Sequence, residues 1–145
     1  MDITTADIIG AIESGGDAYA LRFEPAWRYF SDDVTARIMT LHKCSRDTAR
    51  MIASCSYGKF QIMGQALFEQ GFHGHIIKDY IQAPGTQLFS FNTFMGARNI
   101  NFSPADLCIK ARRDAFALHY NGDTSGAYSE KIAQQLILAG KAVQS

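Results

Sequence analysis

Three short segments hold the residues whose types and spacing could do chemistry. The first is Glu13-Ser14-Gly15-Gly16, where an apolar helix is expected to give way to a loop. The second is segment 56–62, which reads Ser-Tyr-Gly-Lys-Phe-Gln-Ile, and the third is the turn Tyr120-Asn121-Gly122. One acid, one glycine-containing segment with Tyr and Gln side chains, and one Tyr-Asn-Gly turn predict a saccharide-cleaving site with a single dominant acid.

Glu13 is the acid of this predicted site. The residues one helical turn earlier, Ile9 and Gly10, are apolar. Partial burial on that face disfavours the charged carboxylate and raises its pKa, and the C-terminal end of the helix dipole acts in the same direction. Protonation of a glycosidic oxygen near neutral pH requires such a neutral carboxyl group. The alternative is an exposed glutamate at a helix end with no chemical role.

The other two segments offer hydrogen-bonding groups. Gly58 has no side chain, which would let a ligand approach the backbone, and Gln61 offers a donor and an acceptor for an acetamido or hydroxyl group. Asn121-Gly122 is a strong turn signal, and Tyr120 before it could place its hydroxyl beside an acid. Taken alone, each segment also fits an ordinary turn whose aromatic residues pack in the core.

The remaining reactive residue types predict neither a metal site nor a cofactor. His73 and His75 have a spacing found in some metal sites, but no cluster of cysteines or carboxylates accompanies them. The three cysteines, Cys44, Cys55 and Cys108, are odd in number and scattered, which predicts free thiols rather than a disulfide framework.

The composition predicts one compact domain over residues 1–145. Of these residues 47% are hydrophobic, which is enough for a core, and the formal net charge is zero. A neutral chain gives no indication of nucleic acid or anionic membrane as a partner. The N-terminus lacks the features of a signal peptide, and no run approaches the roughly 18 apolar residues of a membrane span. We therefore expect synthesis in the cytoplasm without membrane insertion.

The elements that must position these residues are predicted to be mainly α-helical, with at most a small β-hairpin. Residues 19–24 are expected to be extended, 56–67 to mix turn and helix, and 71–75 to form a glycine-rich break. Each of the three prolines is expected to start a helix or helical turn. The expected helical segments are 5–14 with Thr4 and Asp7 as a capping pair, 25–30, 31–40, 45–54, one around 76–81, one from Pro84, one from Ser103-Pro104, 114–120 and 128–139.

The ordered set of motifs resembles the lysozyme-like superfamily of goose-type lysozymes and soluble lytic transglycosylases. It is more similar to the phage endolysin N-acetylmuramidase family, over nearly the whole chain. Two features depart from the pattern: Asp114-Ala115 stands where the family often has Asp-Trp, and the transglycosylase Ala-Glu-Asn-Ile motif has no clear counterpart. The segments that carry the resemblance are 11–15, 21–25, 56–64, Gln87-Leu88 with Phe91 and Phe94, Phe116-Ala117, Tyr120-Asn121-Gly122, and Tyr128 with 131–133.

This resemblance implies a lysozyme-like fold and a cofactor-free muramidase. Its substrate would be the β-1,4 bond between N-acetylmuramic acid and N-acetylglucosamine in peptidoglycan, with Glu13 as general acid and Tyr120 near it. A second carboxylate would be Glu24 or, less favoured, Asp17, although Glu24 could equally pair with Arg22. The residues that the resemblance assigns to substrate binding are Ser14, Tyr57, Gly58, Phe60, Gln61 and Asn121.

Three alternatives remain open from the sequence. Without a second carboxylate in range, the acetamido group of the substrate could take its role, and a lytic transglycosylase would leave 1,6-anhydro ends. The chain could instead be a catalytically silent wall-binding or virion structural protein, or act on chitin. In the preferred interpretation it is a monomer without a separate cell-wall-binding module, and it reaches the glycan strands of the wall after release or delivery.

Overall fold

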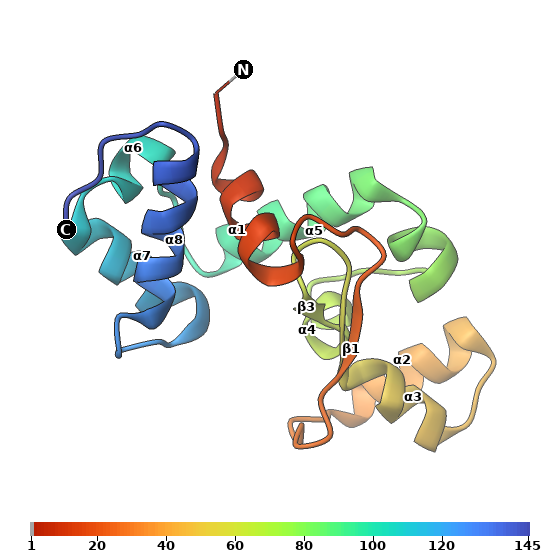
Figure 1. Cartoon of the computed structure of the whole chain (residues 1–145). Coiled ribbons are helices and arrows are strands. Elements are labelled where there is room, and N and C mark those ends of the chain that lie inside the picture. The colour runs from red at the N-terminus through yellow and green to blue at the C-terminus, as the bar shows by residue number, and fades with distance from the viewer. Residues whose placement is uncertain (1) are drawn as a thin grey trace.

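Helices dominate residues 2–145, which a computed structural model describes, and a small sheet accompanies them (Figure 1). The strands pair antiparallel in the order β1-β2-β3, with Leu21 opposite Tyr57 and Tyr57 opposite Ile62. The expected fold class, mainly α with a small β-hairpin, is confirmed. The elements are α1 Thr5–Ser14, β1 Leu21–Phe23, α2 Asp32–His42, α3 Arg46–Ala53, β2 Cys55–Tyr57, β3 Ile62–Met63, α4 Gly64–Glu69, the π-helix η1 Ile76–Ile81, α5 Pro84–Ala97, α6 Pro104–Leu107, α7 Lys110–Asn121 and α8 Ala127–Leu138.

Local capping signals set several helix starts. Thr4 and Asp7 form a capping box at α1, in which each side chain accepts the other residue's backbone N–H. Ser31 and Ser45 accept backbone N–H groups at the starts of α2 and α3, as their positions predicted. Ser103 forms a second capping box before Pro104 at α6. These starts were predictable because each depends on residues within one helical turn.

Segment 25–30 is not the helical turn that Pro25 predicted. The Trp27 N–H donates to Glu24 O at 3.1 Å, which closes one turn, and no helix follows until α2. The Arg28 guanidinium donates to the carbonyls of Pro25 at 2.8 Å and Trp27 at 2.9 Å. These side-chain bonds satisfy backbone acceptors that a helix would have used.

Two other boundaries also differ from the predictions. Strands β2 and β3 precede α4 where segment 56–67 was expected to mix turn and helix, and helix α7 begins at Lys110 rather than at Asp114. β2 pairs with β1, more than thirty positions earlier, so its conformation depends on a partner that local sequence does not show.

The buried apolar side chains form one connected cluster to which α1 contributes Ile8 and Ile9. Helix α8 packs against both α1 and α7, and α2 packs against α3. In Figure 1 the C-terminal helices α6, α7 and α8 gather on one side of α1, while α2 and α3 lie beyond the sheet on the other side. The C-terminal end of α1 therefore lies between the sheet and α8. Among residues 2–145, no helix has the length and apolar character needed to cross a bilayer.

Candidate active site

The Glu13 side chain lines a cavity of about 410 Å³ at the C-terminal end of α1. Strand β3 with the turn before it, helices α4 and α7, α5 with its C-terminal cap, and the segment between β1 and α2 contribute the rest of its wall. Most lining groups are apolar or aromatic, with a few polar side chains among them, which is the usual composition of a small-molecule site. The lining residues are Glu13, Trp27, Phe60, Gln61, Ile62, Met63, Ala66, Phe94, Arg98, Tyr120 and Asn121.

The carboxyl group of Glu13 is partly buried and hydrogen-bonded. The hydroxyl of Tyr128 donates to its Oε1 at 2.7 Å. Burial raises the pKa of Glu13 above its usual value, while the Tyr128 hydrogen bond and the positive charges of Lys131 and Arg22 lower it by less. The net direction is upward, as the apolar face of α1 predicted. A group in this environment retains its proton to higher pH than an exposed glutamate.

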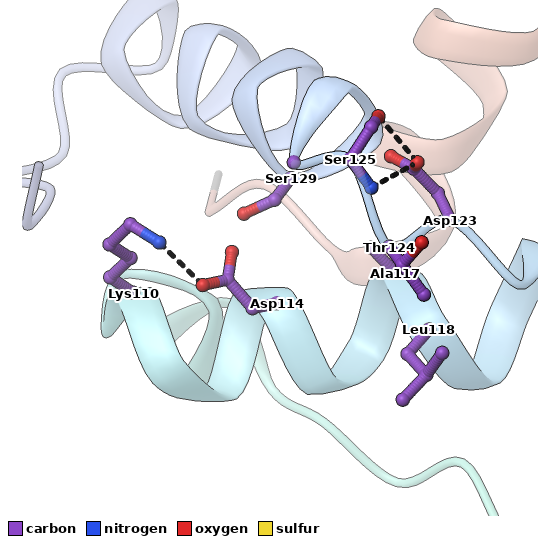
Figure 2. A pocket seen from close by; sticks show the side chains of 9 residues that line it. Lys110, Asp114, Ala117, Leu118, Asp123, Thr124, Ser125 and Ser129 are labelled. Carbon is purple, nitrogen blue, oxygen red and sulfur yellow. Dashed lines mark hydrogen bonds and ion pairs between the residues drawn. The ribbon is translucent and has the colours of Figure 1, made fainter.

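A compact turn between α7 and α8 sets the position of Tyr128. The Oδ1 atom of Asp123 accepts both the backbone N–H and the hydroxyl of Ser125, as Figure 2 shows, and its Oδ2 accepts the Tyr128 N–H at 2.7 Å. Asn121 Oδ1 accepts the Asp123 N–H at 2.9 Å. The predicted Asn-Gly turn therefore helps to position Tyr128 in the first turn of α8, and Tyr128 in turn binds the carboxyl group of Glu13.

A second cavity lies beside this turn, with an ion pair between Lys110 and Asp114 in its wall (Figure 2). Its acidic groups already have partners: Asp123 binds the turn, and Asp114 pairs with Lys110. This cavity is distinct from the one that Glu13 lines.

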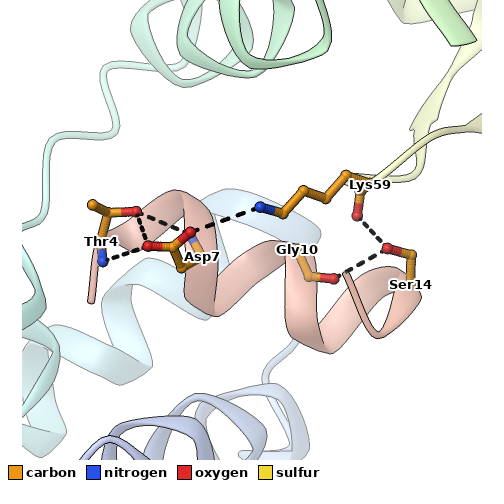
Figure 3. Close-up of polar contacts among 5 residues, drawn as sticks. All are labelled: Thr4, Asp7, Gly10, Ser14 and Lys59. Carbon is orange, nitrogen blue, oxygen red and sulfur yellow. Dashed lines mark hydrogen bonds and ion pairs between the residues drawn. The ribbon is translucent and has the colours of Figure 1, made fainter. Parts of the chain in front are cut away.

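Lys59 holds the end of α1 against the turn that carries Gln61 (Figure 3). The Ser14 hydroxyl donates to Lys59 O at 2.7 Å, and the Lys59 ammonium reaches back along the helix to Asp7 Oδ1 at 3.7 Å. The Lys59 side chain crosses Gly10, where a Cβ atom would lie 2.5 Å from its Cε. Ser14 thus fixes the backbone beside Glu13 and is not part of the cavity wall.

Gln87 of α5 holds the same turn from its other side. Its buried amide accepts the Lys59 N–H at 2.8 Å and donates to Ala18 O at 2.8 Å. Gly58 has a φ of 74°, and a Cβ there would lie 2.4 Å from Gln87 Oε1. The space beside Gly58, expected to admit a ligand, is therefore occupied by Gln87. Tyr57 is buried and donates its hydroxyl to Ile52 O at 2.7 Å, so neither Tyr57 nor Gly58 lines the cavity.

Gln61 lines the cavity with a backbone in the left-handed region, at a φ of 51°. Its amide N–H groups donate to Gly58 O at 2.9 Å and Ala20 O at 3.3 Å, and its Oε1 accepts the Ser56 hydroxyl at 2.7 Å. Both amide hydrogens are thus used by the protein. Gln61 can still accept a further hydrogen bond at Oε1, whose second lone pair is free of these contacts.

Tyr120 and Phe60 form part of an aromatic wall. The Tyr120 ring stacks on Phe116 with centroids 5.5 Å apart and meets the edge of Phe94 at 5.6 Å. Burial raises the pKa of Tyr120, and the charge of Glu13 adds to this rise, so the phenol is neutral. Phe60 stacks on Phe91 at 4.3 Å. The direct hydrogen bond to Glu13 comes from Tyr128 and not from Tyr120.

Neither candidate for a second carboxylate lines the cavity. Glu24 pairs with Arg22 through Oε1 and Nε at 3.1 Å, and Arg22 in turn acts electrostatically on Glu13. Asp17 is exposed and accepts the Tyr19 N–H at 2.8 Å. Of the described residues in the cavity wall, Glu13 is the only acid.

Sequence reasoning assigned no site role to Tyr128, Trp27, Phe94 and Arg98. Phe94 and Tyr128 stood within the motifs of the resemblance, which gave them no role at the site. Arg98 lies over the Phe94 ring, with its Cζ 4.2 Å from the centroid. The only signal for Trp27 was its being the single tryptophan in the chain.

The histidines and cysteines lie outside the wall of the cavity that Glu13 lines. His75 Nδ1 accepts the Ile77 N–H at 3.2 Å at the start of η1, and its ring lies 4.6 Å from that of His42. His73 lies at a different cavity. Among residues 2–145, no three side chains of the metal-binding types lie together. The three cysteines named above are free thiols.

Comparisons with known proteins identify the family of the chain. The sequence model of the N-acetylmuramidase family matches residues 14–137, beginning one residue after Glu13. The endolysin of Enterobacteria phage PRD1 is 34% identical over 143 residues, which cover 92% of this chain and 95% of the phage protein. No solved structure gives a significant match. The chain therefore belongs to the phage endolysin N-acetylmuramidase family and is a glycosidase that degrades peptidoglycan.

Proposed function

We propose that this enzyme cleaves the β-1,4 bond between N-acetylmuramic acid and N-acetylglucosamine, with Glu13 as the general acid. The observation that carries the proposal is a partly buried carboxyl group with a raised pKa in the wall of an aromatic cavity. Protonation of the leaving oxygen requires an acid that is still neutral near physiological pH. Every other carboxylate among the described residues lies outside this wall.

Because only one carboxyl oxygen of Glu13 accepts the hydrogen bond from Tyr128, the two oxygens have different roles. Oε1 accepts the Tyr128 hydroxyl, whereas Oε2 has no hydrogen bond with the described residues. The proton that is transferred to the glycosidic oxygen would therefore sit on Oε2. Tyr128 orients the carboxyl group and stabilises the carboxylate that remains after transfer. Tyr120 would support this geometry from the aromatic wall.

The second chemical group distinguishes two versions of the mechanism. Glu24 is our candidate for a second carboxylate because its partner Arg22 acts electrostatically on Glu13. In the alternative, the acetamido group of the substrate takes this role, and the product carries a 1,6-anhydro end. We keep this alternative because, among the described residues of the cavity wall, Glu13 is the only acid, so no second carboxylate lies in the wall.

Mass spectrometry of digested, borohydride-reduced peptidoglycan separates these possibilities. Cleavage by a muramidase leaves N-acetylmuramic acid at the reducing end, so reduction yields muramitol. A transglycosylase leaves 1,6-anhydromuramic ends that borohydride does not reduce. Glucosaminitol ends would contradict the proposed bond.

The Glu13→Gln variant tests the general acid. We expect a loss of about 10²–10⁴ in rate, because the amide cannot donate the proton. The melting temperature at pH 7 should not fall, since the amide oxygen can still accept the Tyr128 hydroxyl and no charge is buried. Glu130→Gln, an exposed site on α8, is the control and should keep full activity. A folded Glu13→Gln variant with more than about a tenth of the parent rate would exclude this role.

We further propose that the enzyme acts as a monomer on the glycan strands of the wall after release or delivery from the cytoplasm. The relative from phage PRD1 is named an endolysin, which supports action on the cell wall. Light scattering coupled to size-exclusion chromatography measures the oligomeric state directly.

A further inference from the structure

Trp27 and Tyr29 lie in the segment that joins β1 to α2, outside the predicted site motifs. Trp27 lines the same cavity as Glu13, and the edge of one ring meets the face of the other, with centroids 5.2 Å apart at 75°. Tyr29 is 76% exposed. The pair therefore presents an aromatic surface that continues from the cavity toward solvent.

The segment that carries this pair is held at several points. The Glu24 N–H donates to Ser54 O at 2.9 Å, and the Arg28 guanidinium binds the carbonyls of Pro25 and Trp27. At its far end Ser31 caps α2 and accepts the amide of Gln65 at 3.2 Å. Anchoring on both sides holds the two rings in place before any ligand binds, which lowers the entropic cost of binding.

The indole N–H of Trp27 has no hydrogen-bond partner among the described residues, although it is buried. A buried donor without an acceptor destabilises the folded state, and buried tryptophans usually find an acceptor. A hydroxyl or acetamido oxygen of a ligand could accept this hydrogen bond after a small shift of the ring.

These features match the chemistry of an amino sugar. A pyranose ring has an apolar C–H face that packs against aromatic rings, and a rim of hydroxyl and acetamido groups that hydrogen-bond. Building on the proposed function, we propose that Trp27 and Tyr29 form a binding subsite for one sugar ring of the glycan strand. Trp27 forms the part within the cavity, and Tyr29 extends it for strands longer than the pair of sugars that flank the cleaved bond.

The single tryptophan makes this inference directly measurable. In the Glu13→Gln background, soluble peptidoglycan glycan strands freed of stem peptides are titrated while tryptophan emission and calorimetric heat are recorded. We expect a saturable shift of the emission to shorter wavelength, because the sugar displaces water from the indole. Tyr29→Ala should weaken the binding by about 2–10-fold, as expected for loss of one aromatic contact. Phe89→Ala removes a ring that is 72% exposed but outside the cavity, and it should change neither signal.

Kinetics in the active enzyme supply a second readout. Tyr29→Ala should raise KM for long glycan strands while kcat is retained, because the subsite binds substrate away from the reacting bond. Saturable heat without any change in emission would overturn the inference, as would unchanged affinity in Tyr29→Ala or no saturable heat at all. Failure of Glu13 as the acid would appear separately, as cleavage of the glycan strands by the Glu13→Gln variant, whereas failure of the subsite would appear as unchanged affinity in Tyr29→Ala.

Discussion

At the scale of single residues, the proposed activity depends on how the surroundings of Glu13 set the pKa of its carboxyl group. Burial raises the pKa of Glu13, and the Tyr128 hydroxyl lowers it by a smaller amount. The acid must be protonated to act, so activity should fall as pH rises through the pKa of Glu13. The position of this alkaline limb therefore reports the balance of the two effects.

Tyr128→Phe should move the alkaline limb of the pH–activity profile to higher pH. The hydroxyl donates to the carboxylate and favours its charged form, so its removal raises the pKa of Glu13 further. Tyr120→Phe is the matched control, because Tyr120 lines the same cavity as Glu13 and packs against Tyr128, whereas the hydrogen bond to the carboxyl group comes from Tyr128. Profiles of kcat/KM for both variants test this, and a shift to lower pH in Tyr128→Phe would contradict the assignment.

Glu24→Gln should reduce activity more than Asp17→Asn. Glu24 pairs with Arg22, whose charge acts on Glu13, whereas Asp17 is exposed and binds only the Tyr19 N–H. Melting temperatures decide the cause of any loss. A large loss with unchanged melting indicates a chemical role, while a parallel loss of stability indicates that the Arg22 pair holds the segment. Greater damage from Asp17→Asn would reverse the ranking.

At the scale of elements, the active site depends on how α1, the 58–61 turn and α5 are joined. Gln87 binds both the Lys59 N–H and Ala18 O from within α5, and the Ser14 hydroxyl binds Lys59 O. These bonds place Gln61 and Glu13 in the same cavity wall, although Gln87 and Ser14 do not themselves line the cavity. The turn thus sets the position of this part of the cavity wall, to which it contributes the side chains of Phe60 and Gln61.

Gln87→Leu should lower the free energy of unfolding by about 2–6 kcal/mol. The change removes the partners of two backbone groups, each worth about 1–3 kcal/mol when left unsatisfied in the interior. Thermal melting should show a fall of at least about 5 °C. Asn92→Leu, at an exposed position on the same helix, is the control and should melt close to the parent. Equal melting of the two variants would show that the Gln87 amide does not hold the turn.

The sequence predicted those elements and residues whose determinants are local. The capping box at Thr4, the serine caps and the place of Glu13 at the end of α1 each depend on a few neighbouring residues. β2 was missed because its pairing with β1 is not local. Tyr128 was missed as the partner of Glu13 because 115 positions separate them, and only the packing of α8 on α1 brings them together.

At the scale of the whole molecule, the buried apolar side chains of residues 2–145 form one connected cluster that stabilises the fold. Cys55 is buried, and Cys44 and Cys108 are partly buried, all as free thiols. Burial raises the pKa of Cys55, which keeps this thiol in its neutral, unreactive form. His75 is engaged at the start of η1, where its ring nitrogen accepts backbone N–H groups.

Lytic activity should therefore survive both chelator and reductant. Turbidity loss of permeabilised Gram-negative cells is measured with EDTA, with dithiothreitol and with neither, using enzyme preincubated in each. We expect equal rates, because among residues 2–145 no three side chains of the metal-binding types lie together and the cysteines are free thiols. Since chelator also weakens the outer envelope of such cells, purified peptidoglycan serves as the control substrate. Activity lost in EDTA and restored by a divalent ion would assign His73 and His75 a metal, and unfolding in dithiothreitol would contradict the free-thiol assignment.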